Sequence, residues 1–237
     1  MCGRFVSASP PDEVARYFRA QPPETVLEPS YNVAPTSDVY VVLEDGSVRR
    51  MEAFHWGLVP PWAPDPSIGN RMINARAETV ATKSAFRNAF RRRRCIIPVD
   101  GFYEWAAVPG RRRKQPYYLH RPDGEPLALA GLWERWSDPD RPGGQLRSCT
   151  IITTSANDAV RRVHDRMPVI LPPATWDRWL DPDEHDPDLL GRLLVPAPPS
   201  LLELYPVSTE VNDVRHKGSH LLDRVEVDEA AGGATSH

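Results

Sequence analysis

The sequence predicts a mostly antiparallel β-sheet that closes on itself, with helices packed outside it. Short runs of β-branched and aromatic residues follow one another without regular crossover helices between them, which favours antiparallel pairing. The chain also has 26 prolines among its 237 residues, about twice the usual share of ~5%, and this favours loops over long helices. Its hydrophobic content of 41% and charged content of 26% are ordinary for a globular domain.

The clearest strand pair is a hairpin at residues 39–54. The apolar runs 39–43 and 48–54 are joined by the segment 44–47, whose Asp-Gly pair suits a tight turn. Further strands are expected at 94–99, 117–119, 127–133, 148–154, 168–170 and 205–207.

Helices are predicted at 11–18 and 79–92. The first has Pro11 near its start followed by two acidic residues, and the second has Ala81, Ala85, Phe86 and Ala89 on one side. Shorter helices are expected at 157–163, 173–180 and 188–194, the last within a Pro- and Asp-rich excursion at 181–200. The length suits a single domain over residues 1–222, and the polar residues 223–237 are expected to form a disordered tail.

Composition restricts the class of function. The net charge of −3 gives no general attraction to nucleic acid, so any DNA contact needs a local basic face. The basic runs 91–94 and 111–114 are expected to be solvated surfaces, the first at a helix end and the second at a hairpin tip. No coiled-coil pattern or long apolar stripe appears, which favours a monomer.

Cysteine and histidine spacing indicates neither a metal site nor a cofactor. Cys2, Cys95 and Cys149 are odd in number and far apart, which argues against a disulfide framework or a thiolate zinc site. The histidines lack metal-ligand spacing. No apolar run approaches the ~18 residues of a membrane span, and no secretory segment opens the chain. We therefore expect a cytoplasmic protein that does not enter a membrane.

Cys2 is the most informative residue. If Met1 is removed, Cys2 carries an α-amine and a thiol on adjacent carbons, with ordinary pKa values near ~8 and ~8.5. Such a pair condenses with an aldehyde to an imine, and the thiol then closes a five-membered thiazolidine. The position suggests covalent chemistry on a carbonyl, although an incidental cysteine could also stand there.

Other residues are candidates with simpler alternatives. Glu104 stands among aromatic residues, where desolvation would raise its pKa, unless strand alternation turns it outward. His164 titrates near neutrality, but a lone histidine is more often a surface or hydrogen-bonded residue. Asn74 could donate to an oxyanion or simply cap a helix.

Arg4, Arg76, Arg87 and Arg166 are candidates for binding phosphates, which match the guanidinium geometry. The alternative is a set of surface ion pairs. Trp62, in a proline-rich aromatic loop, suits stacking on single-stranded DNA or packing in the core.

Nine segments together resemble the SRAP family, the SOS-response-associated peptidases that shield abasic sites in DNA. They run in order across most of the chain: MCGRF at 1–5, YNVAPT at 31–36, WGLVPPW at 56–62, INARAET at 73–79, RCIIPVDGFYEW at 94–105, AGLWE at 130–134, TIITTSAN at 150–157, VHDRMPVIL at 163–171 and YPVSTEVN at 205–212. The resemblance implies an α+β fold, in which a curved antiparallel sheet forms an open barrel with peripheral helices.

The resemblance also implies a chemistry that combines autopeptidase (hydrolase) and lyase-like steps. Cys2 becomes the N-terminus when the protein removes its own Met1, and it then forms a thiazolidine crosslink with the aldehyde of an abasic site in single-stranded DNA. Asn74 matches the residue that orients the sugar and the new N-terminus, Glu104 the proton-transferring carboxylate, and His164 the residue that protonates the departing sugar oxygen.

The same resemblance implies DNA contacts. Arg4, Arg76 and Arg166 match phosphate-contacting positions, and Pro35 and Trp62 lie in loops that help to kink DNA at the lesion. A bend exposes an abasic site readily, because no base stack must be broken there. This implies work at the bacterial nucleoid during DNA repair.

Two alternatives remain open. The Met-Cys-Gly start is also that of N-terminal-nucleophile amidotransferases, in which Cys2 would attack a glutamine amide. A module that binds single-stranded or modified DNA without a covalent step is the other.

Overall fold

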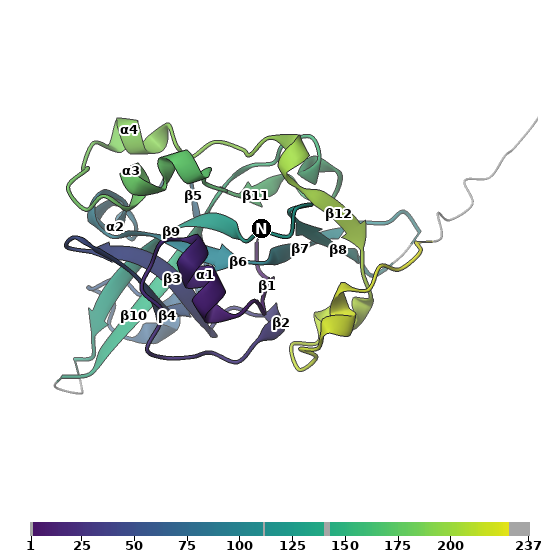
Figure 1. Cartoon of the computed structure of the whole chain (residues 1–237), viewed down its shortest axis with the longest axis horizontal. Helices are drawn as coiled ribbons and strands as arrows, with labels where there is room; N and C mark the ends of the chain where they lie inside the picture. The colour runs from purple at the N-terminus through teal and green to yellow at the C-terminus, as the bar shows by residue number, and fades with distance from the viewer. Residues whose placement is uncertain (1, 111, 140–142, 228–237) are drawn as a thin grey trace, which may run out of the picture.

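The computed structural model of the protein describes residues 2–110, 112–139 and 143–227. Its centre is a five-stranded mixed barrel in the order β10-β4-β3-β6-β9, and β9 pairs back with β10 to complete the ring (Figure 1). The ring pairs are antiparallel except β10 with β4, which are parallel. The barrel strands are β3 (Asp38–Asp45), β4 (Val48–Trp56), β6 (Arg94–Val99), β9 (Leu127–Ser137) and β10 (Gln145–Ser155).

A second, fully antiparallel sheet lies beside the barrel in the order β12-β8-β7-β1-β2 (Figure 1). Its strands are β1 (Phe5–Ser7), β2 (Ser30–Val33), β7 (Gly101–Ala106), β8 (Gln115–His120) and β12 (Glu203–Pro206). Together with the peripheral helices, the two sheets form an α+β fold, which confirms the predicted fold class.

The end of β10 near residue 155 has two further short partners. β5 (Asn74–Arg76) pairs parallel with it, with Ile151 opposite Asn74, and β11 (Arg166–Pro168) pairs antiparallel, with Ser155 opposite Arg166. This one strand therefore brings two distant chain segments to the same end of the barrel.

The helices are short and lie outside the sheets. The α-helices are α1 (Pro11–Tyr17), α2 (Arg87–Arg92), α3 (Trp176–Leu180) and α4 (Pro187–Gly191). The 3₁₀ helices are η1 (Pro66–Arg71), η2 (Val160–Arg162), η3 (Pro173–Thr175), η4 (Pro199–Leu201), η5 (Thr209–Asn212) and η6 (Ser219–Leu222).

The predicted helix at 79–92 is wrong over most of its length, because only Arg87–Arg92 is α-helical. Residues 79–86 form turns, in which the Thr82 N–H donates to the Thr79 carbonyl at 3.1 Å. Thr79, Val80 and Thr82 are β-branched and lose side-chain freedom in a helix. Val80 is 1% exposed and packs in the apolar cluster that the helices cover. The helix expected at 157–163 is likewise reduced to η2.

Barrel strands are buried on both faces. On β3, Val41 and Leu43 join a cluster shared with β1, β7 and β8 of the second sheet, whereas Tyr40 and Val42 face a cluster covered by α1, α2, α3 and α4. This alternation follows the two-residue period of a strand. Cys2 belongs to the first cluster, between the barrel and the second sheet.

The C-terminal part of the described chain returns to the second sheet. The Val225 N–H donates to the Pro206 carbonyl at 3.0 Å, and Arg224 bridges to Val207. The predicted domain boundary at residue 222 stays a prediction, and residues 228–237 of the expected tail lie outside the described residues. In the part of the chain that is described, no helix is long and apolar enough to span a membrane.

Candidate active site

Cys2 is held in the interior at the edge of the first apolar cluster. It is 0% exposed, and it lies three residues before β1 (Phe5–Ser7), which pairs with β2 on one side and β7 on the other in the second sheet. In that strand Phe5 pairs with Val33 on one side and with Phe102 on the other. The Arg4 carbonyl accepts a 2.9 Å hydrogen bond from the Tyr103 N–H. The backbone that follows Cys2 is thus held by strands on both sides from Phe5 on.

Asn74 reaches Cys2 from the barrel. Its Nδ2 donates to the Cys2 carbonyl oxygen at 2.9 Å. Its Oδ1 is buried and, among the described residues, accepts no hydrogen bond. The side chain therefore binds the backbone of Cys2 with one end and presents an unused acceptor with the other. Its proposed alternative, a helix N-cap, is wrong here because Asn74 lies in β5.

Glu104 is buried rather than turned outward. It is 2% exposed in β7, a strand whose residues are buried on both faces. Burial raises the pKa of the Glu104 carboxyl above its ordinary value. Burial also raises the pKa of the Cys2 thiol, and the nearby Glu104 charge raises it further. Both shifts favour the protonated form, of the Cys2 thiol and of the Glu104 carboxyl group alike.

His164 lies between η2 and β11, with a quarter of its side chain exposed. Its Nδ1 is 3.0 Å from the Arg166 N–H, which needs an acceptor, and 2.8 Å from Asp165 Oδ1, which needs a donor. These two contacts require different protonation states of one nitrogen. Burial lowers the pKa of His164, so we favour the neutral ring, in which Nδ1 accepts and Nε2 carries the proton.

The candidate phosphate ligands fall into two groups. Arg76 and Arg87 are exposed. Arg4 instead donates through Nη1 to Asn32 Oδ1 at 2.7 Å and to the Val211 carbonyl at 2.8 Å. Arg76 and Arg87 thus face solvent, whereas the guanidinium of Arg4 joins distant segments of the chain.

Arg166 forms a bidentate ion pair with Glu78, in which the Nη1–Oε1 distance is 2.5 Å and the Nη2–Oε2 distance is 2.9 Å. The hydrogen bonds from Arg166 lower the pKa of the Glu78 carboxyl. Nη2 also donates to the Thr153 carbonyl at 2.7 Å. A phosphate at Arg166 would have to share this guanidinium with Glu78.

Trp62 projects from the surface, which decides against core packing. It is 57% exposed, although its loop is fixed on both sides. The Val59 N–H donates to Ser148 Oγ, and Trp136 Nε1 donates to the Ala63 carbonyl, both at 2.8 Å. The loop therefore holds the Trp62 ring in solvent.

Pro35 is half-buried and precedes Thr36, a β-branched residue with φ 70°. This conformation costs of order 1–3 kcal/mol. A hydrogen bond from the Thr36 N–H to the Trp56 carbonyl at 2.9 Å helps to hold it.

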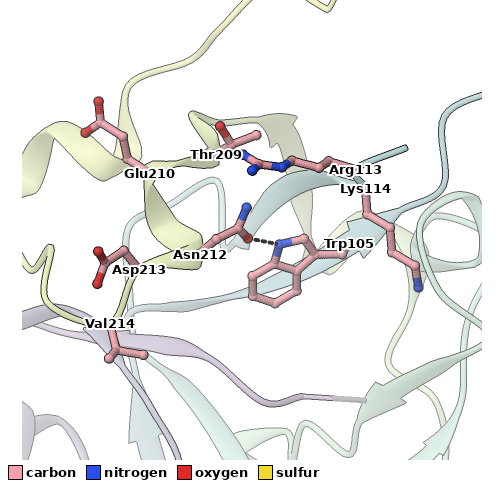
Figure 2. Close-up of a pocket in the computed structure, with 8 residues that line it drawn as sticks. All are labelled: Trp105, Arg113, Lys114, Thr209, Glu210, Asn212, Asp213 and Val214. Carbon is pink, nitrogen blue, oxygen red and sulfur yellow. Dashed lines mark hydrogen bonds between the residues drawn. The ribbon is translucent and has the colours of Figure 1, made fainter. Parts of the chain in front are cut away.

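A groove beside Glu104 was missed by sequence reasoning (Figure 2). It is lined by Trp105, Arg113, Lys114, Thr209, Glu210, Asn212, Asp213 and Val214, and its volume is about 660 Å³. The basic run at 111–114 was the available signal, but it was interpreted as a solvated surface; Arg111 lies outside the described residues. Among the residues that are described, no group of three or more His, Cys, Asp or Glu could hold a metal ion.

The structure thus brings the amide of Asn74 to the carbonyl of the buried Cys2, and the charge of Glu104 acts on the Cys2 thiol. The sequence profile of the SOS response associated peptidase (SRAP) family matches residues 1–214. The chain belongs to this family, as the nine motifs predicted.

Relatives of the chain occur in both bacteria and vertebrates. It is 42% identical over 225 residues to the abasic site processing protein YoqW of Bacillus subtilis, covering 94% of this chain and 99% of YoqW. It is 30% identical to the abasic site processing protein HMCES of Xenopus tropicalis, covering 100% of this chain and 82% of HMCES. A crystal structure from Bacteroides thetaiotaomicron has a TM-score of 0.82 at 25% identity and covers 95% of this chain and 100% of that protein.

Proposed function

We propose that this protein processes abasic sites by covalent capture: Cys2, once Met1 is removed, forms a thiazolidine with the aldehyde of an abasic site in single-stranded DNA. One observation carries the proposal. Asn74 Nδ2 donates to the Cys2 carbonyl at 2.9 Å and so fixes the residue that would carry both the amine and the thiol. The names of the relatives YoqW and HMCES as abasic site processing proteins support the substrate.

Removal of Met1 is a hydrolysis carried out by the protein itself. Water adds to the Met1 carbonyl, the bond from that carbon to the Cys2 nitrogen breaks, and the products are free methionine and the Cys2 amine. Glu104 is the group to accept a proton from the attacking nucleophile and return it to the leaving nitrogen, because its raised pKa brings it closer to neutrality. The protein would thereby act as a peptidase once, on its own chain.

Capture then proceeds in two bond-forming steps. The sugar opens when the C1′–O4′ bond breaks: the C1′ hydroxyl gives its proton to the Glu104 carboxylate, and O4′ takes a proton from the minor, protonated form of His164. The Cys2 amine condenses with the C1′ aldehyde to an imine and releases one water. The thiol then adds to the imine carbon, with its proton passing to the nitrogen, so that the ring closes.

Ring closure explains how the DNA would be protected. An open imine acidifies the C2′ protons and invites β-elimination, which breaks the strand. The saturated thiazolidine has no such electron sink. The free acceptor Oδ1 of Asn74 is suited to orient the Cys2 amine or a sugar hydroxyl during these steps.

The DNA would be bound on the surface around Cys2, through phosphate contacts at Arg4, Arg76, Arg87 and Arg166. The exposed ring of Trp62 would stack on an unpaired base. We propose that the protein works as a monomer in the cytoplasm, at the nucleoid during the SOS response.

The first experiment mixes the purified protein, with Met1 shown to be absent by intact mass, with single-stranded DNA carrying one abasic site. We expect a band that survives denaturing electrophoresis, with the mass of protein plus DNA less one water, and no such band for Cys2→Ser. DNA binding without any adduct would overturn the proposal in favour of a non-covalent binding module. Glutaminase activity without an adduct would instead favour an amidotransferase.

A further inference from the structure

Trp56 ends β4 and lies, fully buried, in the same apolar cluster as Cys2. Both polar groups of its backbone are bound. The Trp56 N–H donates to the Ser37 carbonyl, and the Trp56 carbonyl accepts from the Thr36 N–H, each at 2.9 Å. The barrel therefore fixes the point from which the indole ring projects.

The indole N–H binds the chain next to Asn74. Trp56 Nε1 donates to the Ile73 carbonyl at 3.0 Å, and the Ile151 N–H donates to the same oxygen at 3.1 Å. This carbonyl belongs to the planar peptide group whose nitrogen is that of Asn74. Donors from two barrel strands, β4 and β10, therefore set the plane of this peptide group and the direction in which the Asn74 side chain leaves the backbone.

The same ring packs on the strand that follows Cys2. The ring centroids of Trp56 and Phe5 are 4.8 Å apart, with an angle of 42° between the planes, a distance at which aromatic pairs attract each other. Phe5 is the first residue of β1. One indole therefore contacts the segment that carries the proposed nucleophile and the segment that carries Asn74, the donor to the Cys2 carbonyl.

We propose that Trp56 is a positioning residue for covalent capture: its indole N–H fixes the peptide group before Asn74, so that the Asn74 amide stays on Cys2 while the abasic aldehyde reacts. The inference rests on the proposed function and adds a residue to it. Of the two donors to the Ile73 carbonyl, only the Ile151 N–H remains when the indole N–H is removed. The Asn74 side chain then gains freedom to leave the reactive geometry, and a displacement of about 1 Å can slow a reaction on the order of 100-fold.

The test measures single-turnover crosslinking to a single-stranded abasic oligonucleotide, with protein whose N-terminal Cys2 is verified by intact mass. Trp56→Phe keeps an aromatic ring beside Phe5 but removes the N–H donor, so the rate at saturating DNA should fall by about three- to tenfold. Because Trp56 is buried, the DNA concentration that gives half the maximal rate should stay within about twofold of wild type.

A double-mutant cycle with Asn74→Ala separates positioning from a general loss of stability. If Trp56 acts through Asn74, Trp56→Phe should change the rate by less than about twofold once Asn74 is replaced. Its effect on the free energy of unfolding, measured by urea titration, should persist in both backgrounds. A merely structural role would instead slow the reaction by the same factor with and without the Asn74 side chain.

Trp179→Phe is the matched control. Trp179 is also 0% exposed, and its Nε1 donates to the Cys95 carbonyl at 2.8 Å. It lies in the apolar cluster that the helices cover, where its ring contacts Phe90. The substitution should therefore lower the free energy of unfolding by an amount comparable to that of Trp56→Phe and leave the crosslinking rate as in wild type.

The outcomes separate the two proposals. A wild-type protein that forms no crosslink with single-stranded abasic DNA overturns the proposed function. A wild-type protein that crosslinks, with Trp56→Phe at the same rate or slowed by the same factor with and without the Asn74 side chain, overturns the positioning role alone. If Trp56→Phe does not fold, benzothienylalanine at position 56 replaces the N–H by sulfur and keeps the bicyclic ring, and the same criteria apply.

Discussion

Asn74→Ala tests whether the hydrogen bond to Cys2 positions the nucleophile. The bond joins Asn74 Nδ2 to the Cys2 carbonyl at 2.9 Å, and Cys2 is fully buried. Truncation leaves that carbonyl without its donor, which costs about 1–3 kcal/mol for a buried polar group. At ~1.36 kcal/mol for each factor of ten, the crosslinking rate should fall by roughly 5- to 160-fold.

The assay is single-turnover crosslinking to a single-stranded abasic oligonucleotide. The protein is produced behind a leader that a site-specific protease removes to leave Cys2 at the N-terminus, so that maturation does not limit the rate. Asn74→Asp keeps the side-chain shape but replaces the donor by an oxygen that repels the carbonyl, and it should be at least as slow as Asn74→Ala.

Asn70→Ala is the matched control, because Asn70 is exposed at the end of η1 and should react like wild type. The reasoning is refuted if Asn74→Ala folds normally and reacts at the wild-type rate. In that case the backbone pairing of the first strand alone would position Cys2.

Three further results are expected. Because the folded pKa of Glu104 is raised, its contribution to stability is present below the ordinary carboxyl pKa and is lost as pH rises through the folded value. Between about pH 4 and 8, thermal unfolding should therefore show that Glu104→Gln loses less stability with rising pH than wild type does. An equal loss in the two proteins would contradict a raised pKa of Glu104. In Gly101→Ala the new Cβ would contact the Tyr118 ring and lie 2.6 Å from the Leu119 carbonyl oxygen, so the free energy of unfolding should fall by about 1–3 kcal/mol or more, measured by urea titration. Trp62→Ala should change stability by less than about 0.5 kcal/mol, because the ring is exposed, yet weaken single-strand binding by about 1–3 kcal/mol in a fluorescence titration; unchanged binding would exclude stacking.

Sequence patterns predicted the strands better than the helices. The hairpin at 39–54 is present as β3 and β4, because its Asp-Gly turn and apolar flanks are local signals. The prediction of a helix at 79–92 was wrong over its first half, because the β-branched residues Thr79, Val80 and Thr82 lower the helix propensity there. Spacing alone also did not indicate that β10 pairs parallel with β4 and β5, since such pairing depends on contacts far apart in the chain.

The motifs were sufficient to select the candidate residues, but they did not predict how the fold would place these residues relative to one another. The strand that carries Asn74, β5, and the strand that follows His164, β11, both pair with the end of β10, and no local pattern encodes that register. Glu104 illustrates the limit: alternation in a strand favours an outward side chain, whereas packing between two layers buries it at 2% exposure.

The burial of Cys2 bears on how a crosslink would be cleared. A chain terminus is usually the part of a protein that frays first and is cut first. Here the second residue is in the core, so a protease would gain access to the attachment point only after the domain opens. The lifetime of an adduct against proteolysis should therefore follow the stability of the whole fold, and any mutation that destabilises the barrel would shorten the time for which the DNA stays covered.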